Sequence, residues 1–211
     1  MSPTGILAVL NDIDPACDRA EYEAWYQRDH MPDRLAVPGF RHARRYRRTE
    51  GPAQEYFTFY ETDSPAVLRT PAYVARLAAP TGWTTAMMRH FRAMCRSIAV
   101  VGFDQGSGTG GIVAVIGAAH ALPAADAARL APLLETVTRV RLWCAAEDVA
   151  MNPEAALRPG IDTSLGTILV VEGTDASTVR QAAIAGGAAL GLSAKPSLYS
   201  LLYASPQVAA P

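Results

Sequence analysis

The residues best suited to chemistry lie in one short segment, residues 21–40, which brings two tyrosines, a tryptophan and a histidine together. Tyr22, Tyr26 and His30 recur every four residues and therefore share one stripe of a helix. A histidine in the last helical turn suits general acid–base catalysis, and neighbouring tyrosines could hydrogen-bond to it or to a substrate. The pattern predicts His30 as the acid–base residue, assisted by Tyr22 or Tyr26. A core helix that ends in a histidine cap stays an open alternative, because aromatic stripes at this spacing are typical of cores.

A second group of candidates lies on a segment that is expected to be helical over about residues 82–92. Trp83, Met87, His90 and Phe91 recur at i, i+4, i+7 and i+8, which places them on one face. Packing against a sheet accounts for the three apolar members. His90 could reach the mouth of a pocket, although a surface or capping role is the more ordinary one. Trp83 and His90 therefore join the candidate substrate-binding residues.

The only basic run, residues 41–48, contains five arginines on one predicted strand. Alternation along the strand divides them between two faces and dilutes any patch that nucleic acid could bind. Solvated side chains facing nearby carboxylates would explain most of them. A sharper interpretation is that Arg45 enters a cavity and binds a carboxylate or phenolate of the substrate. Trp25, Tyr46 and Trp83 would line the same cavity.

The composition disfavours several classes of function. The chain has 211 residues and a formal net charge of −1, with 50% hydrophobic and 18% charged residues. This balance is typical of a globular protein and argues against nucleic acid or a membrane as a partner. Three widely spaced cysteines indicate a reducing compartment without disulfides or a zinc site. We expect a cytoplasmic protein, since we find neither a signal peptide nor an apolar run of membrane-spanning length.

The sequence also lacks the motifs of several cofactor-dependent enzymes. It contains no Gly-x-Gly-x-x-Gly, no Walker loop, no His-Glu-x-x-His and no Gly-x-Ser-x-Gly. Dinucleotide, nucleotide, zinc-protease and serine-hydrolase chemistry are therefore disfavoured. We expect an activity that needs no cofactor and no metal.

The elements that must position these residues recur in the same order on both sides of a glycine-rich segment. The first set reads strand, helix, strand, strand, helices and strand, at about residues 6–10, 18–31, 40–48, 55–60, 64–92 and 97–103. Its first helix is expected to stop near Met31, because Pro32 follows. The second set falls at about residues 111–118, 124–135, 138–146, 166–172, 177–190 and 197–204. We predict an α+β fold of two tandem ferredoxin-like βαββαβ modules, residues 1–104 and 112–211, joined by a linker at 105–111.

Aromatic residues are concentrated in the first predicted module. Only Trp143, Tyr199 and Tyr203 lie beyond the linker, so we place any chemistry in the first module and regard the second as structural. The strand at residues 55–60 carries Phe57 and Phe59 on one face and tyrosines on the other. A ferredoxin-like sheet covers only one face with its own helices, so the other face needs a second sheet. Two such sheets would form a barrel around a cavity, either within one chain or between two subunits.

Several motifs in the first half occur together in a known family. They are Trp25-Tyr-x-x-x-His30-x-Pro32, Leu35-x-Val-Pro-Gly-Phe40, Arg44-Arg-Tyr46, Ser64-Pro, Thr70-Pro-x-Tyr73, Pro80-Thr-x-Trp83-Thr and Met87-Met-x-His-Phe91. In this order they resemble the EthD-like branch of the dimeric α/β-barrel superfamily, over about residues 5–103. The second half carries none of these motifs and shares only the order of elements.

The resemblance implies a ferredoxin-like fold whose sheets pair around a small-molecule cavity, usually in a homodimer. Relatives include cofactor-independent monooxygenases, lactone isomerases, and polyketide cyclases or dehydratases, and in several the helix histidine, here His30, points into the cavity. We therefore expect proton-transfer chemistry on an aromatic, polyketide-like or lactone substrate, with a small hydrophobic or aromatic molecule as the partner. The alternative is a non-catalytic protein of the same fold that binds such a molecule.

Overall fold

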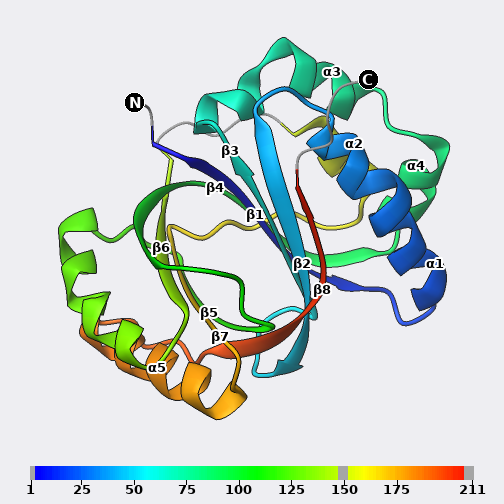
Figure 1. Cartoon of the computed structure of the whole chain (residues 1–211). Coiled ribbons are helices and arrows are strands. Elements are labelled where there is room, and N and C mark those ends of the chain that lie inside the picture. The colour runs from blue at the N-terminus through cyan, green and yellow to red at the C-terminus, as the bar shows by residue number, and fades with distance from the viewer. Residues whose placement is uncertain (1–2, 147–151, 207–211) are drawn as a thin grey trace.

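The computed structural model describes residues 3–146 and 152–206, and at its centre eight antiparallel strands form a closed barrel (Figure 1). In the first half, the elements are β1 (Gly5–Ile13), α1 (Arg19–Trp25), a π-helical turn η1 (Tyr26–His30), α2 (Met31–Leu35), β2 (Phe40–Glu50), β3 (Tyr56–Thr62), η2 (Pro65–Arg69), α3 (Pro71–Ala78), α4 (Gly82–Met88) and β4 (Phe91–Gly106). In the second half, they are β5 (Ile112–Ala118), η3 (Ala124–Glu135), β6 (Arg139–Ala145), η4 (Pro153–Leu157), β7 (Thr167–Gly173), α5 (Ala176–Ala189) and β8 (Ser197–Pro206). The α+β class and the antiparallel sheet are confirmed.

The barrel closes within a single chain. The strand order around it is β1-β3-β2-β8-β5-β7-β6-β4, so each half contributes four neighbouring strands in a matching order, β4-β1-β3-β2 and β8-β5-β7-β6. The halves meet at two seams, where β2 pairs with β8 and β4 pairs with β6. Each seam removes a sheet edge that would otherwise expose unpaired backbone groups.

Aromatic side chains fill the middle of the barrel, where a cavity between the two sheets was expected, and a hollow of about 410 Å³ remains that is lined in part by Leu10, Cys95 and Val115 of the barrel core. Phe57 and Phe59 point inward from β3 and pack with Trp143 from β6 and Tyr199 from β8, and all four are fully buried. Tyr46 stacks on the two phenylalanines, with ring centroids 5.7 and 6.1 Å away. The predicted division of β3 into two faces is confirmed, but the inward face serves as a core.

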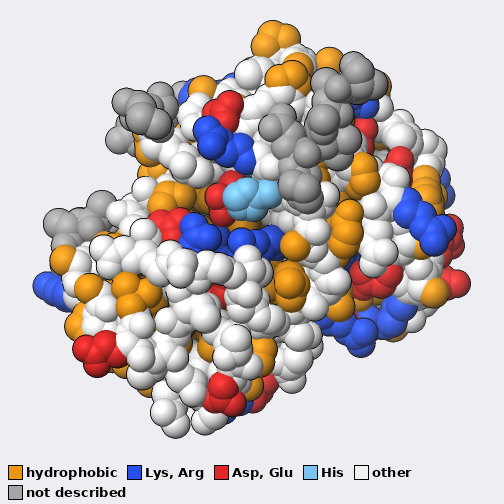
Figure 2. Space-filling view, in the orientation of Figure 1, with side chains coloured by type: hydrophobic (Ala, Val, Ile, Leu, Met, Phe, Trp, Pro, Cys, Tyr) orange, Lys and Arg blue, Asp and Glu red, His pale blue; other side chains and the backbone are white. Residues whose placement is uncertain are grey.

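Charged side chains form one further layer inside the barrel. Arg141 donates to Glu61 at 3.0 Å and to Glu172 at 2.8 Å, and Arg44 donates to Glu172 at 3.0 Å. Arginine thus comes from β2 and β6, and glutamate from β3 and β7, which are the equivalent strands of the two halves. Figure 2 shows acidic and basic side chains with one histidine in the hollow at the centre of this face.

Helices cover the outside of the barrel in two groups (Figure 1). The segment α1-η1-α2 lies with α3 and α4 on the first half, over a core that includes Tyr22, Tyr56 and Tyr60. The second group, α5 and η3, covers a core of leucine, valine and alanine. No described helix has both the length and the apolar character needed to cross a bilayer.

Two predicted helix ends were wrong. The first helix continues past Pro32 to Leu35, because the π turn resets the hydrogen-bonding register just before the proline. The helix expected over residues 82–92 ends at Met88, and Phe91 begins β4.

The predicted linker at 105–111 begins too early, because Gln105 and Gly106 still pair with β6. The ends of the predicted modules, residues 1–2 and 207–211, lie outside the described residues.

Candidate functional site

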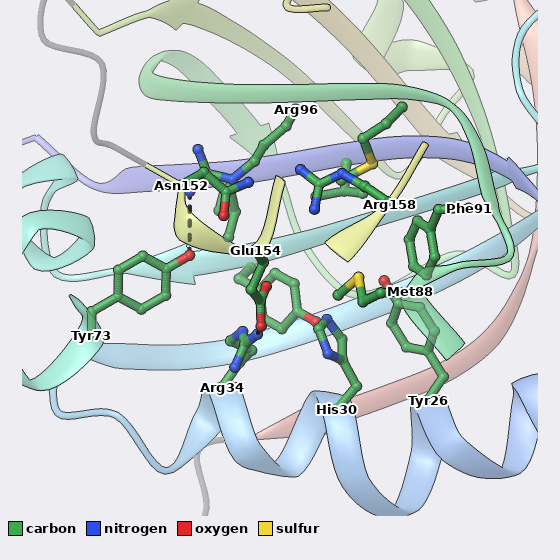
Figure 3. Close-up of a pocket in the computed structure, with 14 residues that line it drawn as sticks. Tyr26, His30, Arg34, Tyr73, Met88, Phe91, Arg96, Asn152, Glu154 and Arg158 are labelled. Carbon is green, nitrogen blue, oxygen red and sulfur yellow. Dashed lines mark hydrogen bonds and ion pairs between the residues drawn. The ribbon is translucent and has the colours of Figure 1, made fainter. Parts of the chain in front are cut away.

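A small enclosed pocket lies between the first helical segment and the outer face of the barrel, rather than inside the barrel (Figure 3). Its floor comes from strands β1, β3 and β4, and its wall from Tyr26, His30 and Arg34 of the helix. Three residues reach across from the second half: Asn152 and Arg158 at the two ends of η4, and Glu154 within it. The cavity has a volume of about 30 Å³, which is room for about two water molecules.

The π turn places the histidine in this wall. The backbone N–H of Met31 donates to the carbonyl of Tyr26, five residues earlier, instead of the usual four. The wider turn leaves Pro32 in the first turn of α2, where its missing N–H costs little. Tyr26, His30 and Arg34 consequently lie along one side of a continuous helical segment and all line the pocket.

His30 is a neutral histidine in a cationic environment. Its side chain is buried, with ring centroids 4.6 Å from Trp25 and 5.0 Å from Tyr26. Burial lowers the pKa of His30 well below its ordinary value, and the charges of Arg34, Arg45 and Arg158 lower that pKa further. The imidazole is therefore unprotonated near pH 7 and can act as a proton acceptor.

Arg34 supplies a buried positive charge that is fully paired. Its guanidinium binds Asp33 at 2.6 Å and also forms an ion pair with Glu154. Burial opposes the charge, but the Glu154 carboxylate holds the pKa of Arg34 above its usual value. The pair connects α2 to η4 and closes one side of the pocket (Figure 3).

Two polar groups in the pocket lack partners among the described residues. The hydroxyl of Tyr60 and the side-chain oxygen of Asn152 are buried, and neither has a hydrogen-bond partner within the described part of the chain. Burial raises the pKa of Tyr60 well above its usual value, so its hydroxyl stays protonated and available to donate. Buried polar groups are normally hydrogen-bonded, and such groups beside a cavity suit a ligand or water.

Arg96 and Arg158 complete the polar lining. Arg96 extends from β4 and donates to the hydroxyl of Tyr73 at 3.3 Å, an interaction at one end of the pocket in Figure 3. Arg158 is buried and donates from Nε to Asp162 at 3.0 Å. With Arg34, they bring the number of guanidinium groups that line the cavity to three. The one carboxylate in the lining is that of Glu154. The arrangement favours negative charge developing on a bound molecule.

Of the eight residues that the sequence singles out, only Tyr26 and His30 line this pocket. Tyr22 and Trp25 lie in the core of the helical layer, where the Tyr22 hydroxyl accepts from Asn11 at 3.0 Å and Trp25 donates to Thr84 at 3.1 Å. Tyr22 is therefore placed away from His30's cavity, and the proposed assistance by Tyr22 has no support from its position.

Arg45 lies beneath α1 and not in the cavity. Its guanidinium carbon lies 3.6 Å from the ring centroid of Tyr26, 4.3 Å from that of Tyr56 and 4.9 Å from that of Tyr22. Glu23 accepts from its Nε at 3.3 Å. Arg45 is thus held by aromatic faces and a carboxylate, and it acts on His30 only through its charge.

The remaining three candidates lie elsewhere. Tyr46 packs inside the barrel. Trp83 is partly buried against the core of the helical layer. His90 is half-buried beyond the end of α4, where its backbone carbonyl accepts from the N–H of Asp14 at 2.7 Å. The early end of α4 breaks the expected stripe after Met87, so His90 does not share the face of Trp83.

Sequence reasoning missed most of the polar lining, including Arg34, Tyr60, Arg96, Glu154 and Arg158. Tyr60 could have been found, because it shares the outer face of β3 with Tyr56 and that face must meet the helix that carries His30. Arg34 continues the four-residue spacing of Tyr26 and His30, but the assumed stop at Pro32 hid it. The residues around η4 carry no local signal, since their approach depends on closure of the barrel. No group of three or more histidine, cysteine, aspartate or glutamate side chains suited to a metal occurs among the described residues.

No family model matches the sequence, and no curated protein does. Solved structures of similar fold include an anthrone oxidase-like protein, with a TM-score of 0.59 and 9% identity over 100% of this chain and 97% of that one. A proposed monooxygenase from Fusobacterium nucleatum subsp. nucleatum has a TM-score of 0.55 and 9% identity, over 98% and 95%. A haem-binding protein from Thermus thermophilus has a TM-score of 0.55 and 12% identity, over 96% and 92%. The similarity confirms a dimeric α/β-barrel type of fold. It does not assign the chain to the EthD-like branch.

The pocket does not fit a haem. Its volume of about 30 Å³ is roughly tenfold below the lower end of ordinary ligand pockets, and a haem is a large group. In the second half, the described histidine is His120, which is exposed in the turn after β5 and lines none of the described pockets. We therefore derive no step through a haem.

Proposed function

We propose that this protein is a small-molecule enzyme of the dimeric α/β-barrel type in which His30 removes a proton from the substrate without a cofactor. The substrate is an aromatic, polyketide-like or lactone molecule with an acidic C–H or O–H group. Cyclase, dehydratase, isomerase and cofactor-independent monooxygenase chemistry can each start from proton removal, which leaves an anion on the substrate. Assignment to the EthD-like branch, descent of the two halves from tandem ferredoxin-like modules, and a homodimer belong to the same proposal.

One observation carries the proposal: a neutral, buried imidazole lies in a cavity lined by guanidinium groups. The charges that disfavour an imidazolium would also stabilise an anion formed beside it. When His30 takes the proton, the C–H or O–H bond breaks, an N–H bond forms, and the electron pair stays on the substrate as an enolate or phenolate. The Tyr60 hydroxyl, which stays protonated, can donate a hydrogen bond to that oxygen.

In this proposal Tyr60 takes the assisting role that the sequence suggests for Tyr22 or Tyr26, and Tyr26 contributes to the wall of the pocket. The substrate must enlarge the cavity as it enters. Met88 and Met94 line the pocket, and their flexible thioether chains can repack at little cost. Asn152, Glu154 and Arg158 from the second half form the opposite wall, which the Arg34–Glu154 pair holds in place.

The test is proton exchange from carbon acids in D₂O, followed by NMR with a 1,3-diketone, an unsaturated lactone and an anthrone-type aromatic ketone. The wild-type chain should accelerate exchange for at least one of them. His30→Gln should lower that rate by about 10²–10⁴-fold, the usual range for a general base, with an unchanged fold by circular dichroism. Wild-type exchange rates in the His30→Gln variant would refute the role of His30.

The small size of the cavity favours a second candidate, a non-catalytic protein that binds a small molecule. The present volume of about 30 Å³ admits only a fragment of an aromatic substrate. Saturable binding of these ketones or lactones, with no exchange above the buffer rate, would select this alternative.

A further inference from the structure

Among the described residues, Arg96 differs from the other two arginines of the pocket in having no carboxylate partner. Arg34 is paired with Asp33 and Glu154, and Arg158 with Asp162. The Arg96 guanidinium donates to the neutral hydroxyl of Tyr73 at 3.3 Å, and it forms no ion pair with a carboxylate of the described residues.

The position of Arg96 makes this charge unusual. Arg96 points outward from β4 toward the helical layer, in the same row as Met94 and Ile98, both of which are buried in the apolar core there. The backbone N–H of Arg96 donates to the carbonyl of Thr163 at 2.8 Å, which fixes the residue beneath the chain that follows η4. Arg96 is half-buried, so its stem lies along the apolar row while its guanidinium stays available to pair with an anion in the pocket.

The surrounding groups suit a small anion. Arg96, Asn152 and Tyr73 lie together at one end of the pocket in Figure 3, whereas His30 and Tyr26 approach from the helix. The cavity has room for about two water molecules, which is close to the size of a carboxylate group. A planar guanidinium can hold a carboxylate through two parallel hydrogen bonds, and the side-chain oxygen of Asn152, which has no partner among the described residues, suits a further polar atom of the ligand.

We propose that Arg96 binds a carboxylate group of the substrate, so that the molecule presented to His30 is an organic acid. The inference rests on the proposed function for the orientation of the substrate, but the anion site itself stands on the contacts of Arg96. Arg96 anchors one end of the molecule, and the acidic C–H or O–H group then lies toward His30.

The experiment measures binding of acetate and benzoate to the full-length chain by NMR titration, with acetamide and benzamide as neutral analogues of nearly the same shape. Ionic strength is held constant with sodium chloride. The carboxylates should bind saturably and at least about tenfold more tightly than the amides, since a charge-assisted pair is lost in the amide. Arg96→Gln should bring the carboxylates to the level of the amides, whereas Arg96→Lys should retain part of the preference.

Arg92→Gln provides the matched control, because Arg92 lies on the same strand but pairs with Asp14 outside the pocket. It should bind acetate and benzoate as the wild type does. Equal affinity of the wild type for carboxylate and amide, or unchanged carboxylate affinity in a folded Arg96→Gln variant, would overturn the proposal. His30→Gln should still bind acetate, so loss of proton exchange in that variant with intact acetate binding separates the base from the anion site.

Discussion

Arg34 of α2 and Glu154 of η4, 120 residues apart in the sequence, form a buried ion pair that fastens the second half of the chain over the pocket of the first. The side chains expose only 4% and 6% of their surface, so neither charge can be solvated if its partner is removed. The site is therefore built by both halves, although the helix that carries its histidine belongs to one.

The buried pair predicts a strong and asymmetric response to mutation. Arg34→Met should lower the free energy of unfolding by about 3–5 kcal/mol, because it leaves Glu154 buried without its partner. The double variant Arg34→Met, Glu154→Leu should recover much of this loss. Urea denaturation measures both effects.

The control for this pair is Arg180→Met, which breaks the exposed pair with Glu50. It should cost no more than about 1 kcal/mol, since exposed ion pairs contribute little. Equal losses for Arg34→Met and Arg180→Met would contradict the importance given to burial.

The depressed pKa of His30 predicts a dependence of stability on pH. In the unfolded chain a histidine binds its proton near pH 6.5, whereas the folded chain resists protonation down to a lower pH. The unfolded state therefore binds more protons below about pH 6.5, and the folded state loses up to about 1.4 kcal/mol per pH unit as the pH falls. Above pH 6.5 His30 is neutral in both states, and the folded state loses none of this stability.

His30→Gln removes that titrating group and should flatten the difference between pH 7 and pH 5, as measured by urea denaturation at each pH. The imidazole resonance of His30 should also titrate well below pH 6.5 in the wild type. A titration midpoint at or above 6.5 would show that the imidazole is not held neutral by its surroundings.

Much of the architecture could be predicted from sequence because local pattern determined it. The alternating faces of β3 required a covering sheet on one side and helices on the other, and both exist. The sequence pattern could not predict whether the inside of the barrel is a cavity or a packed core. Tyr46, Phe57 and Phe59 look the same in sequence whether they line a cavity or fill a core. The packing of Phe57 and Phe59 against Trp143, and of Tyr46 against Phe59, decides between the two.

The candidate site was predictable only in part, and for two physical reasons. Its helix could be recognised from the spacing of Tyr26 and His30, but the π turn that carries the chain through Pro32 to Arg34 departs from ordinary helical rules. Its covering residues come from a segment whose position depends on the seam between β4 and β6. Contacts of that range follow from topology, which no local pattern in residues 152–158 reveals.

The position of Arg45 against the tyrosine rings predicts that replacing this arginine changes the pKa of His30 but not the residues that line the pocket. Arg45→Met removes a positive charge that lowers the pKa of His30, so that pKa should rise toward its ordinary value. Arg44→Met is the matched control, because Arg44 is the neighbouring residue but lies over the inward-facing ring of Phe59 and pairs with Glu172. NMR titration of the imidazole distinguishes the two variants. A rise of equal size in both would show that the effect comes from loosened packing rather than from charge.

The seam between β4 and β6 predicts a sharp difference between two glycines. Gly106 ends β4 with φ of +106°, a conformation that residues with a side chain rarely adopt, and an added Cβ would lie against the Thr138 carbonyl and 2.7 Å from the Cα of Arg139. Gly106→Ala should therefore lower the free energy of unfolding by at least about 1–3 kcal/mol, because strain and a backbone collision act together. Gly111, in the same connection, has open space around it and no positive φ. Gly111→Ala should be neutral or slightly stabilising, by up to about 1 kcal/mol, since it restricts the unfolded chain. If urea denaturation gave equal midpoints for the two variants, the tight closure of the barrel at Gly106 would be wrong, and with it the register that carries Asn152 and Glu154 over the pocket.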